Sequence, residues 1–427
     1  MGLLTQHSAM TMEFELSLQS IDASLSVPYW DYTMDSARVE ADGKNRISDI
    51  FKNSELFTSE WFGATDSKEH TVTEGRFAYQ AVSLVAETNK ATTTHGPRGF
   101  LRAPWNLNPS KFVTRYHSLC GEDPRMDTDN TEQMGLEWPT CSSHFQLSAG
   151  AATNETVSWY HWVMSAGYLP HGPVHAWIGG VGGLCTTAFD ELEAKGIIDA
   201  KQKKLLKHGS FGLLKNLWRD WLIEMPESCS PDASVAECTW TCKEDISSDH
   251  WAMVFLDMLN MSKSDQGPMD FKEIAHEVIC DTTYWPGDHF EGASPIEASF
   301  WPIHPTLDRL FQYKDMTDPL KDLAWHNITG VMCQTSVNKT SAEVYKSDCL
   351  GHNAEDLTYW KSVNKDAATG AYSASYLTNI EVRDKSMPVT GDYALPYIYD
   401  HFEWDHCAEL GVNFREVPEA IGNPGNM

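Results

Sequence analysis

Two histidines four residues apart are the sequence feature that most constrains how this chain folds. His171 and His175 stand in the run Leu-Pro-His-Gly-Pro-Val-His-Ala-Trp-Ile-Gly-Gly, directly after Pro170. Proline is favoured in the first turn of a helix, so we expect a helix to begin here. Side chains four residues apart then share one helical face, with Cβ atoms about 5–6 Å apart. At that separation both imidazoles can bind one metal ion.

Two further histidines lie in apolar settings. His304 stands in the run Ser-Phe-Trp-Pro-Ile-His-Pro-Thr-Leu-Asp-Arg-Leu, and His7 in the apolar stripe of a helix expected over residues 3–23. A single histidine on such a face is usually an ordinary core residue. Several unpartnered imidazoles in one core, however, would cost free energy that a shared metal ion removes. Three neutral imidazoles without a thiolate suit copper or zinc, and in particular a copper that changes oxidation state.

The expected fold is mainly helical, with long irregular loops around a core that holds the histidines. We assign residues 1–185 and 286–317 to this core. Residues 186–285 are expected to form a helical insertion pinned by disulfides. Residues 318–427 are expected to form a C-terminal extension with strand-like pieces such as Tyr376–Val382.

Helix boundaries within the core follow from apolar periodicity and from proline positions. Besides residues 3–23, helices are expected over 155–166, from Pro170 onward, and from about Pro302 to Tyr313. Residues 33–150 show few long periodic segments, so we expect them to be mainly irregular.

The chain is strongly acidic, with a net charge of −28 from 32 basic and 60 acidic residues. Nucleic acids and anionic membranes bind basic surfaces, so the composition argues against both partners. No apolar run approaches the roughly 18 residues that a membrane span requires. The sequence does not indicate an oligomeric state.

Ten cysteines and four glycosylation sequons, at Asn154, Asn260, Asn327 and Asn338, favour a secreted or vesicle-lumen protein. The sequence does not fix the disulfide pairing. A zinc site formed by Cys238, Cys242 and His250 is an alternative use of some of these residues. Because no signal peptide follows Met1, we expect the natural protein to begin further upstream.

Taken together, these motifs resemble the tyrosinase, catechol oxidase and haemocyanin family of type 3 copper proteins. The matching residues are His171, His175 and Gly179-Gly180; Phe300, His304, Asp308 and Arg309; His7, Phe14, Glu15 and Pro28-Tyr29-Trp30-Asp31; and Arg102 with Pro104-Trp105-Asn106. They span residues 1–185 and 286–316.

The resemblance implies a core of the four-helix-bundle type around a pair of copper ions, since facing helices of a bundle can supply inward-pointing ligands. His171, His175 and His304 would complete one three-histidine site, and His7 would be the third ligand of the other ion, whose remaining two histidines are expected upstream. Glu15 and Asp308 are candidates for groups that orient the rings through their free nitrogens. The candidate substrate pocket consists of Phe300, Trp301, Ile303 and Gly172.

The function that the resemblance implies is oxidation of o-diphenols to o-quinones with dioxygen. Gly172 stands where the family's tyrosinases commonly have an asparagine, and this argues against hydroxylation of monophenols. One alternative is a dioxygen carrier in which residues 318–427 cover the metals. Others are a catalytically inactive secreted glycoprotein that retains the scaffold, and a zinc hydrolase that uses the same three histidines but lacks an obvious general base.

Overall fold

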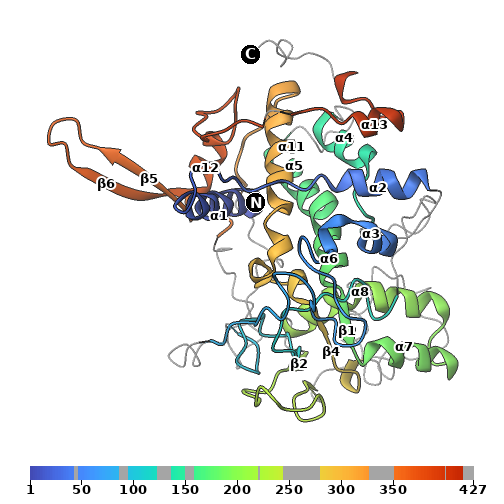
Figure 1. The fold of residues 1–427 in the computed structure, drawn as a ribbon. Helices are drawn as coiled ribbons and strands as arrows, with labels where there is room; N and C mark the ends of the chain where they lie inside the picture. Colours follow the sequence, from blue (N-terminus) through green and yellow to red (C-terminus); the bar gives the residue numbers. More distant parts are fainter. Residues whose placement is uncertain are drawn as a thin grey trace.

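The structure is a computed structural model of the 427-residue chain. It describes residues 1–42, 47–85, 95–122, 136–149, 158–219, 222–243, 279–326, 351–399 and 401–416. Over these residues the chain is mainly helical, as the sequence predicts, and its strands form only two-stranded sheets (Figure 1).

A central helix, α11 (Ile303–Thr317), is buried along its whole length. A helix buried on every side belongs to the core of a large domain, and its charged residues require partners there. Arg309 pairs with Asp31 at 3.1 Å, and Lys314 pairs with Asp318 at 2.5 Å. The carboxylate of Asp315 accepts hydrogen bonds from the backbone N–H groups of residues 389 and 390.

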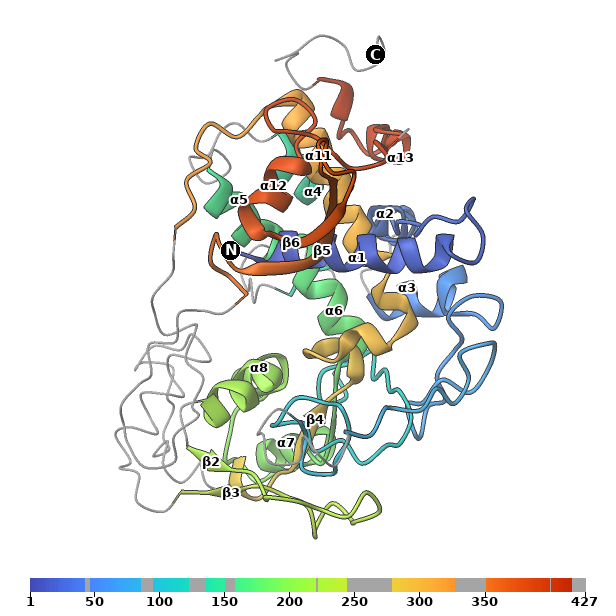
Figure 2. The same cartoon turned by 90° about the vertical axis from the view of Figure 1, so that its left-hand side faces the viewer.

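Several helices pack around α11. The first, α1 (Leu3–Gln19), contacts it directly, as does α4 (Cys141–Ala149). The chain then runs through α5 (Trp159–Ala166) and a π-helical turn, η4 (Gly167–His171), into α6 (Gly172–Gly179). Figure 2 shows α1, α6 and α11 meeting in the middle of the molecule. The histidine-bearing segments therefore converge on one region.

The helices begin close to the predicted positions. Helix α1 starts at Leu3, as expected, and ends at Gln19 rather than at residue 23. Helix α5 starts at Trp159 because the Ser158 hydroxyl caps it, accepting the backbone N–H of His161 at 3.2 Å. Helix α11 extends one turn beyond its predicted end.

The described parts of residues 33–150 are mainly irregular, as expected, but they also contain short helical elements. The structure contains α2 (Tyr32–Ala41), α3 (Ile47–Asn53), a 3-10 turn, η1 (Glu55–Phe57), and α4 in this region. Helices α2 and α3 are only ten and seven residues long, too short for apolar periodicity to reveal them. Much of the remainder is loop, joined by isolated β-bridges.

Within the expected insertion, two helices are seen, α7 (Cys185–Ala194) and α8 (Ala200–Arg219). Two short antiparallel sheets flank them. Strand β1 (Val181–Gly183) pairs with β4 (Tyr284–Pro286), Gly182 lying opposite Trp285, and β2 (Ile223–Glu224) pairs with β3 (Thr241–Cys242). The sequence also shows helical patterns near residues 247–261 and 269–280, and these fall largely outside the described residues.

Four disulfides join the described cysteines: Cys120–Cys185, Cys141–Cys407, Cys229–Cys238 and Cys242–Cys280. Because Cys238 and Cys242 are both oxidised, the alternative zinc site at these residues is wrong. Cys333, Cys349 and the four sequon asparagines lie outside the described residues.

The C-terminal part forms an antiparallel hairpin of β5 (Leu357–Lys365) and β6 (Tyr372–Thr378), which projects from the body in Figure 1. At its base Trp360 and Leu377 pack on Ala9 and Met12 of α1. The strand predicted over Tyr376–Val382 ends early. Thr378 and Glu381 form a capping box that begins α12 (Asn379–Lys385). A short helix, α13 (Asp405–Glu409), follows and is tied to α4 by Cys141–Cys407, so the extension packs on the predicted core.

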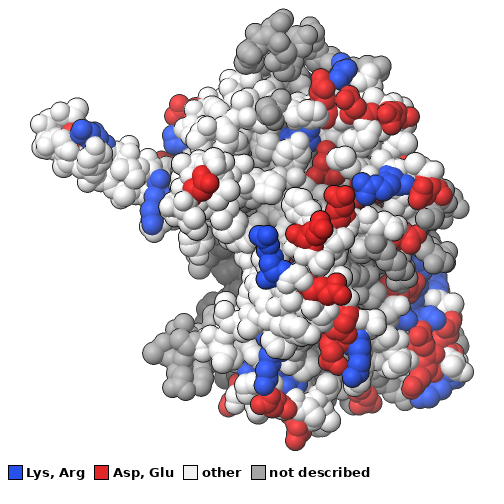
Figure 3. All heavy atoms as spheres, viewed as in Figure 1, with Lys and Arg blue, Asp and Glu red and all other residues white. Residues whose placement is uncertain are grey.

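Acidic side chains are spread over the face shown in Figure 3, and the described residues on that face form no continuous basic patch. Among the described helices, none combines the length and the apolar character that crossing a bilayer demands.

Candidate metal centre

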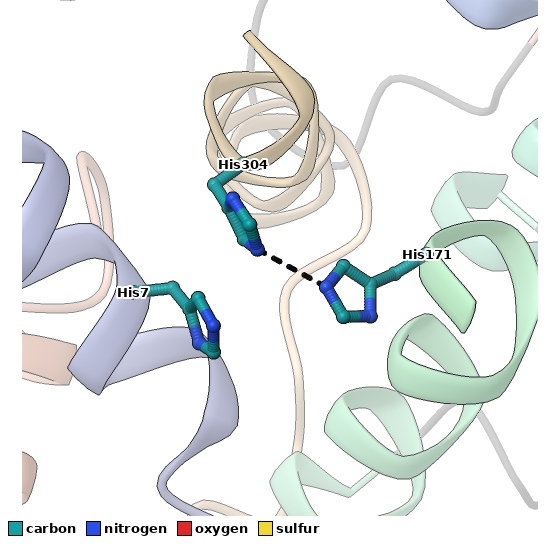
Figure 4. A group of neighbouring side chains, drawn as sticks. All are labelled: His7, His171 and His304. Carbon is teal, nitrogen blue, oxygen red and sulfur yellow. Dashed lines mark hydrogen bonds between the residues drawn. The ribbon is translucent and has the colours of Figure 1, made fainter. Parts of the chain in front are cut away.

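Three separate helices bring the predicted histidines together (Figure 4). His7 lies on α1, His171 ends the π-helical turn that leads into α6, and His304 lies in the first turn of α11. One potential ligand atom from each of these residues lies within 4.8 Å of the other two. The Nε2 atoms of His171 and His304 are only 3.1 Å apart.

The grouping differs in one respect from the sequence prediction, which assigned His7 to a separate ion. In the structure the His7 ring stacks on that of His304, with centroids 4.2 Å apart. His175 lies beside the same group, its ring centroid 4.3 Å from that of His171 and 5.4 Å from that of His304. All four imidazoles therefore form one contiguous cluster.

Backbone carbonyl groups orient the four rings. The Nδ1 atoms of His7, His171 and His304 face the carbonyl oxygen four residues earlier, at 2.6, 3.4 and 3.2 Å. The Nδ1 of His175 faces the carbonyl oxygen of His289 at 2.9 Å. A carbonyl oxygen only accepts, so these contacts place the ring proton on Nδ1 and leave a lone pair on Nε2.

The prediction that Glu15 and Asp308 orient the rings is therefore wrong. Glu15 accepts the backbone N–H of Val27 at 2.9 Å, and Asp308 accepts the hydroxyl of Ser8 at 2.6 Å. The two carboxylates thus fix α1 against its neighbours. Carbonyl oxygens four residues earlier in the chain already lie within reach of the rings of His7, His171 and His304, so no carboxylate is needed.

The electrostatics of the cluster favour neutral imidazoles. His171, His175 and His304 are at most 9% exposed, and His7 is partly exposed. Burial lowers the pKa of all four rings, and neighbouring imidazoles lower the pKa of His171, His175 and His304 further. Neutral imidazole is the form that binds a metal ion.

This donor set fits copper. The lone pairs of His171 and His304 face each other at 3.1 Å, and the Nε2 of His175 is buried without a hydrogen-bond partner. Converging lone pairs repel each other unless a cation lies between them. Metal–imidazole bonds are about 2 Å long, so two ligands of one ion lie within about 4 Å of each other. A copper ion held by His171 and His304, with His7 as the third member of the group whose ligand atoms lie within 4.8 Å of one another, would satisfy their nitrogens together.

The four residues of the predicted substrate pocket are placed differently from one another. Phe300 is buried and lies against the cluster, its ring centroid 4.2 Å from that of His304. Trp301 instead stacks on Phe14 at 3.9 Å and lines a neighbouring apolar cavity of about 750 Å³. Ile303 is completely buried in the main core, so its assignment to a substrate pocket is wrong. Gly172 is the partly exposed first residue of α6.

His289 is a functional candidate that the sequence did not reveal. It is completely buried in a 3-10 turn, η7 (Asp288–Phe290), and its ring centroid is 4.6 Å from that of His175. No other histidine lies three or four residues from it in the sequence, so the local pattern does not mark it as a metal ligand. Only the fold brings it to the cluster.

Two of the sequence motifs turn out to brace the site. Asp31 caps α2, accepting the backbone N–H of Thr33, and also pairs with Arg309 on α11. Arg102 forms a buried two-pronged ion pair with Asp288, with contacts of 2.6 and 2.9 Å. The Asp31–Arg309 pair thus fixes a loop to α11, which carries His304. The Arg102–Asp288 pair fixes another loop to the turn that carries His289.

Comparisons with known proteins agree with this geometry. A family model described as the common central domain of tyrosinase matches residues 2–192. The tyrosinase of Streptomyces antibioticus is 27% identical over 184 residues, which are 42% of this chain and 52% of that protein. The chain thus spans about half the length of the curated relative that it matches. No solved structure matches.

The matched region includes His7, His171 and His175, and His304 lies beyond it. The motifs, the mainly helical fold and the match to the central domain all agree. The comparisons therefore support the tyrosinase family, with residues 2–192 similar to its common central domain.

Proposed function

We propose that this protein is a copper-dependent oxidase that converts o-diphenols to o-quinones with dioxygen. The observation that carries the proposal is the convergence of neutral imidazoles from three helices, with His171 and His304 buried and His7 partly exposed. The similarity to the tyrosinase family favours copper as the bound ion. Copper held there would supply the redox chemistry, in which a diphenol loses two electrons and two protons and dioxygen is reduced.

The residues of the chain have separate tasks in this proposal. His171, His175 and His304 hold one ion through their Nε2 atoms, because their Nδ1 atoms face carbonyl oxygens. His7, stacked on His304, contributes the ligand of α1 to a second ion. The ring of Phe300 packs against the cluster and excludes water from one side of it.

We propose o-diphenols rather than monophenols as substrates. Hydroxylation of a monophenol needs a base that removes its proton, and Gly172 has no side chain to hold a water molecule for that purpose. Oxidation of an o-diphenol does not require such a base. Soluble phenols suit the proposal better than polyanions, because the chain itself is strongly acidic.

Purified chain loaded with copper provides the test. We expect copper to remain bound after dialysis, and catechol to cause oxygen uptake and quinone absorbance, while a monophenol causes neither. The variant His304→Leu should lose both copper and activity. Reversible oxygen binding without catechol turnover would show that the protein is a dioxygen carrier rather than an oxidase. Failure to bind copper would contradict the proposal altogether.

The chain also carries four disulfides among its described residues. Disulfides persist in oxidising compartments, and they support a secreted or vesicle-lumen location. Mass analysis of the protein from its natural source would test this location through glycan masses at the four sequons.

A further inference from the structure

A chain of four buried polar side chains runs outward from His175. The Nδ1 of His175 lies 2.9 Å from the Nδ1 of His289, and the Nε2 of His289 lies 3.4 Å from Oε2 of Glu297. Glu297 pairs with Arg115 at 2.5 Å. The residues His175, His289, Glu297 and Arg115 are 8%, 0%, 1% and 1% exposed. The order is therefore imidazole, imidazole, carboxylate, guanidinium.

Geometry fixes where the protons lie in this chain. His175 carries its proton on Nδ1, because that atom faces the carbonyl oxygen of His289. The Nδ1 of His289 faces the same proton, so it must present a lone pair. The proton of a neutral His289 then lies on Nε2, on the side of the Glu297 carboxylate. The 3.4 Å contact between His289 and Glu297 is electrostatic rather than a hydrogen bond. Both imidazoles thus carry their proton on the side away from the cluster, and the Nε2 lone pair of His175 is directed at the metal site.

The backbone holds His289 against α6 by close contacts that only glycine permits. A Cβ at Gly179 would lie 2.6 Å from backbone and side-chain atoms of Phe290, and one at Gly287 would lie 2.2 Å from the carbonyl oxygen of Gly179. Asp288, next to His289, is fixed by its buried ion pair with Arg102. The imidazole of His289 is therefore placed by a rigid scaffold.

We propose that His289 is a positioning residue for the copper ligand His175, which it holds and polarises through its ring together with Glu297. The proposal rests on the proposed function, since it concerns the same metal site. In metalloproteins a ligand histidine usually donates its second N–H to a carbonyl or carboxylate, and such contacts raise its affinity for the metal. Here an additional imidazole lies between the ligand and the carboxylate.

Copper(I) affinity, measured by competition with a chromophoric chelator, tests the proposal without relying on enzyme activity. We expect His289→Leu to weaken copper binding about 10- to 100-fold, the range seen when such supporting contacts are removed. In His289→Asn the side-chain oxygen stands close to the position of Nδ1 and accepts the same proton. It should therefore retain affinity to within about threefold of the original protein, well inside that range.

His144→Leu is the matched control. His144 lies on α4 and is as deeply buried as His289. It packs against Tyr32, away from the histidine cluster. This variant should bind copper like the original chain, and the melting temperatures of the metal-free variants report on folding. If His289→Leu does not fold, His289→Asn and Glu297→Gln replace it, and Glu297→Gln should weaken binding about tenfold.

Three results would overturn different parts of the account. Unchanged affinity in His289→Leu, or in Glu297→Gln where that variant replaces it, would overturn the positioning role and leave the proposed function intact. Equal losses in the Leu and Asn variants would overturn it as well, because they would indicate that His289 only fills space. A starting chain that binds no copper would instead overturn the proposed function, and this inference with it.

Discussion

His171 and His304 face each other through Nε2 atoms 3.1 Å apart, although the Nδ1 of each ring points at a carbonyl oxygen. This arrangement places two lone pairs in contact inside the core. It is unfavourable in the metal-free chain and favourable once a cation binds both nitrogens. The cluster therefore lowers the stability of the metal-free protein and raises its affinity for a metal ion.

The variant His304→Leu should separate these two effects. We expect the metal-free variant to be more stable than the original chain by about 1–2 kcal/mol, because an unsatisfied buried polar group is replaced by an apolar one. Urea unfolding of both metal-free proteins measures this difference. Added copper should stabilise only the original chain. A metal-free variant that is clearly less stable would mean that His304 is already satisfied without a metal.

The buried ion pair between Asp31 and Arg309 should be important for stability. Their side chains are 8% and 1% exposed, and Arg309 also donates to the carbonyl oxygen of His401 at 2.8 Å. Replacing Arg309 with methionine should cost about 3–5 kcal/mol, because the carboxylate of Asp31 remains buried without its partner. Urea unfolding measures the loss.

Arg415→Met is the control for that experiment. Arg415 pairs with Glu403 and Asp405, but its side chain is 63% exposed. Exposed pairs contribute about 0–1 kcal/mol, so this substitution should change stability little. Equal losses in the two variants would contradict the assignment of Asp31–Arg309 as a structural brace.

The disulfide between Cys141 and Cys407 should stabilise the protein more than the one between Cys229 and Cys238. The bonded residues are 266 positions apart in the first case and 9 in the second. Chain-entropy arguments give about 5.5 and about 2.5 kcal/mol for closing loops of these lengths. Melting of the two double serine variants should therefore show the larger drop for Cys141/Cys407. The reverse order would contradict the packing of the C-terminal part on α4.

Asp308 should make stability depend on pH. Burial raises the pKa of this carboxyl from 3.8 to about 6. Between these values the folded chain binds a proton that the unfolded chain has released, so stability falls as pH rises through this window. The total loss is about 3 kcal/mol and remains at higher pH.

The variant Asp308→Asn removes this loss and can still accept the hydroxyl of Ser8. Its stability relative to the original chain should therefore rise between about pH 4 and pH 6 and then level off. Comparing the two metal-free proteins cancels the titration of the histidines they share. A difference that stays constant across this pH range would show that Asp308 is ionised in the folded chain throughout.

The sequence predicts the metal-site segments well because their signals are local. The spacing of His171 and His175 and the proline before them specify a helix with both rings on one face. The apolar residues around His7 and His304 indicate helices that pack in a core. Those patterns are enough to predict where α1, α6 and α11 begin.

The supporting groups could not be predicted in the same way. His289 reaches His175 only because Gly179 and Gly287 allow two backbones to approach closely, and this contact spans 114 residues of sequence. The carbonyl oxygen that orients His7 is predictable from helix geometry, since Leu3 lies four residues earlier on the same helix. The analogy to carboxylate partners led instead to Glu15 and Asp308.

X-ray absorption of the copper(I)-loaded chain tests the central claim most directly. The account predicts copper bound by imidazole nitrogens at about 2 Å, with at least one imidazole lost from the spectrum of His304→Leu or with no copper retained by that variant. Copper bound without imidazole, or an identical spectrum in the original chain and in His304→Leu, would contradict it.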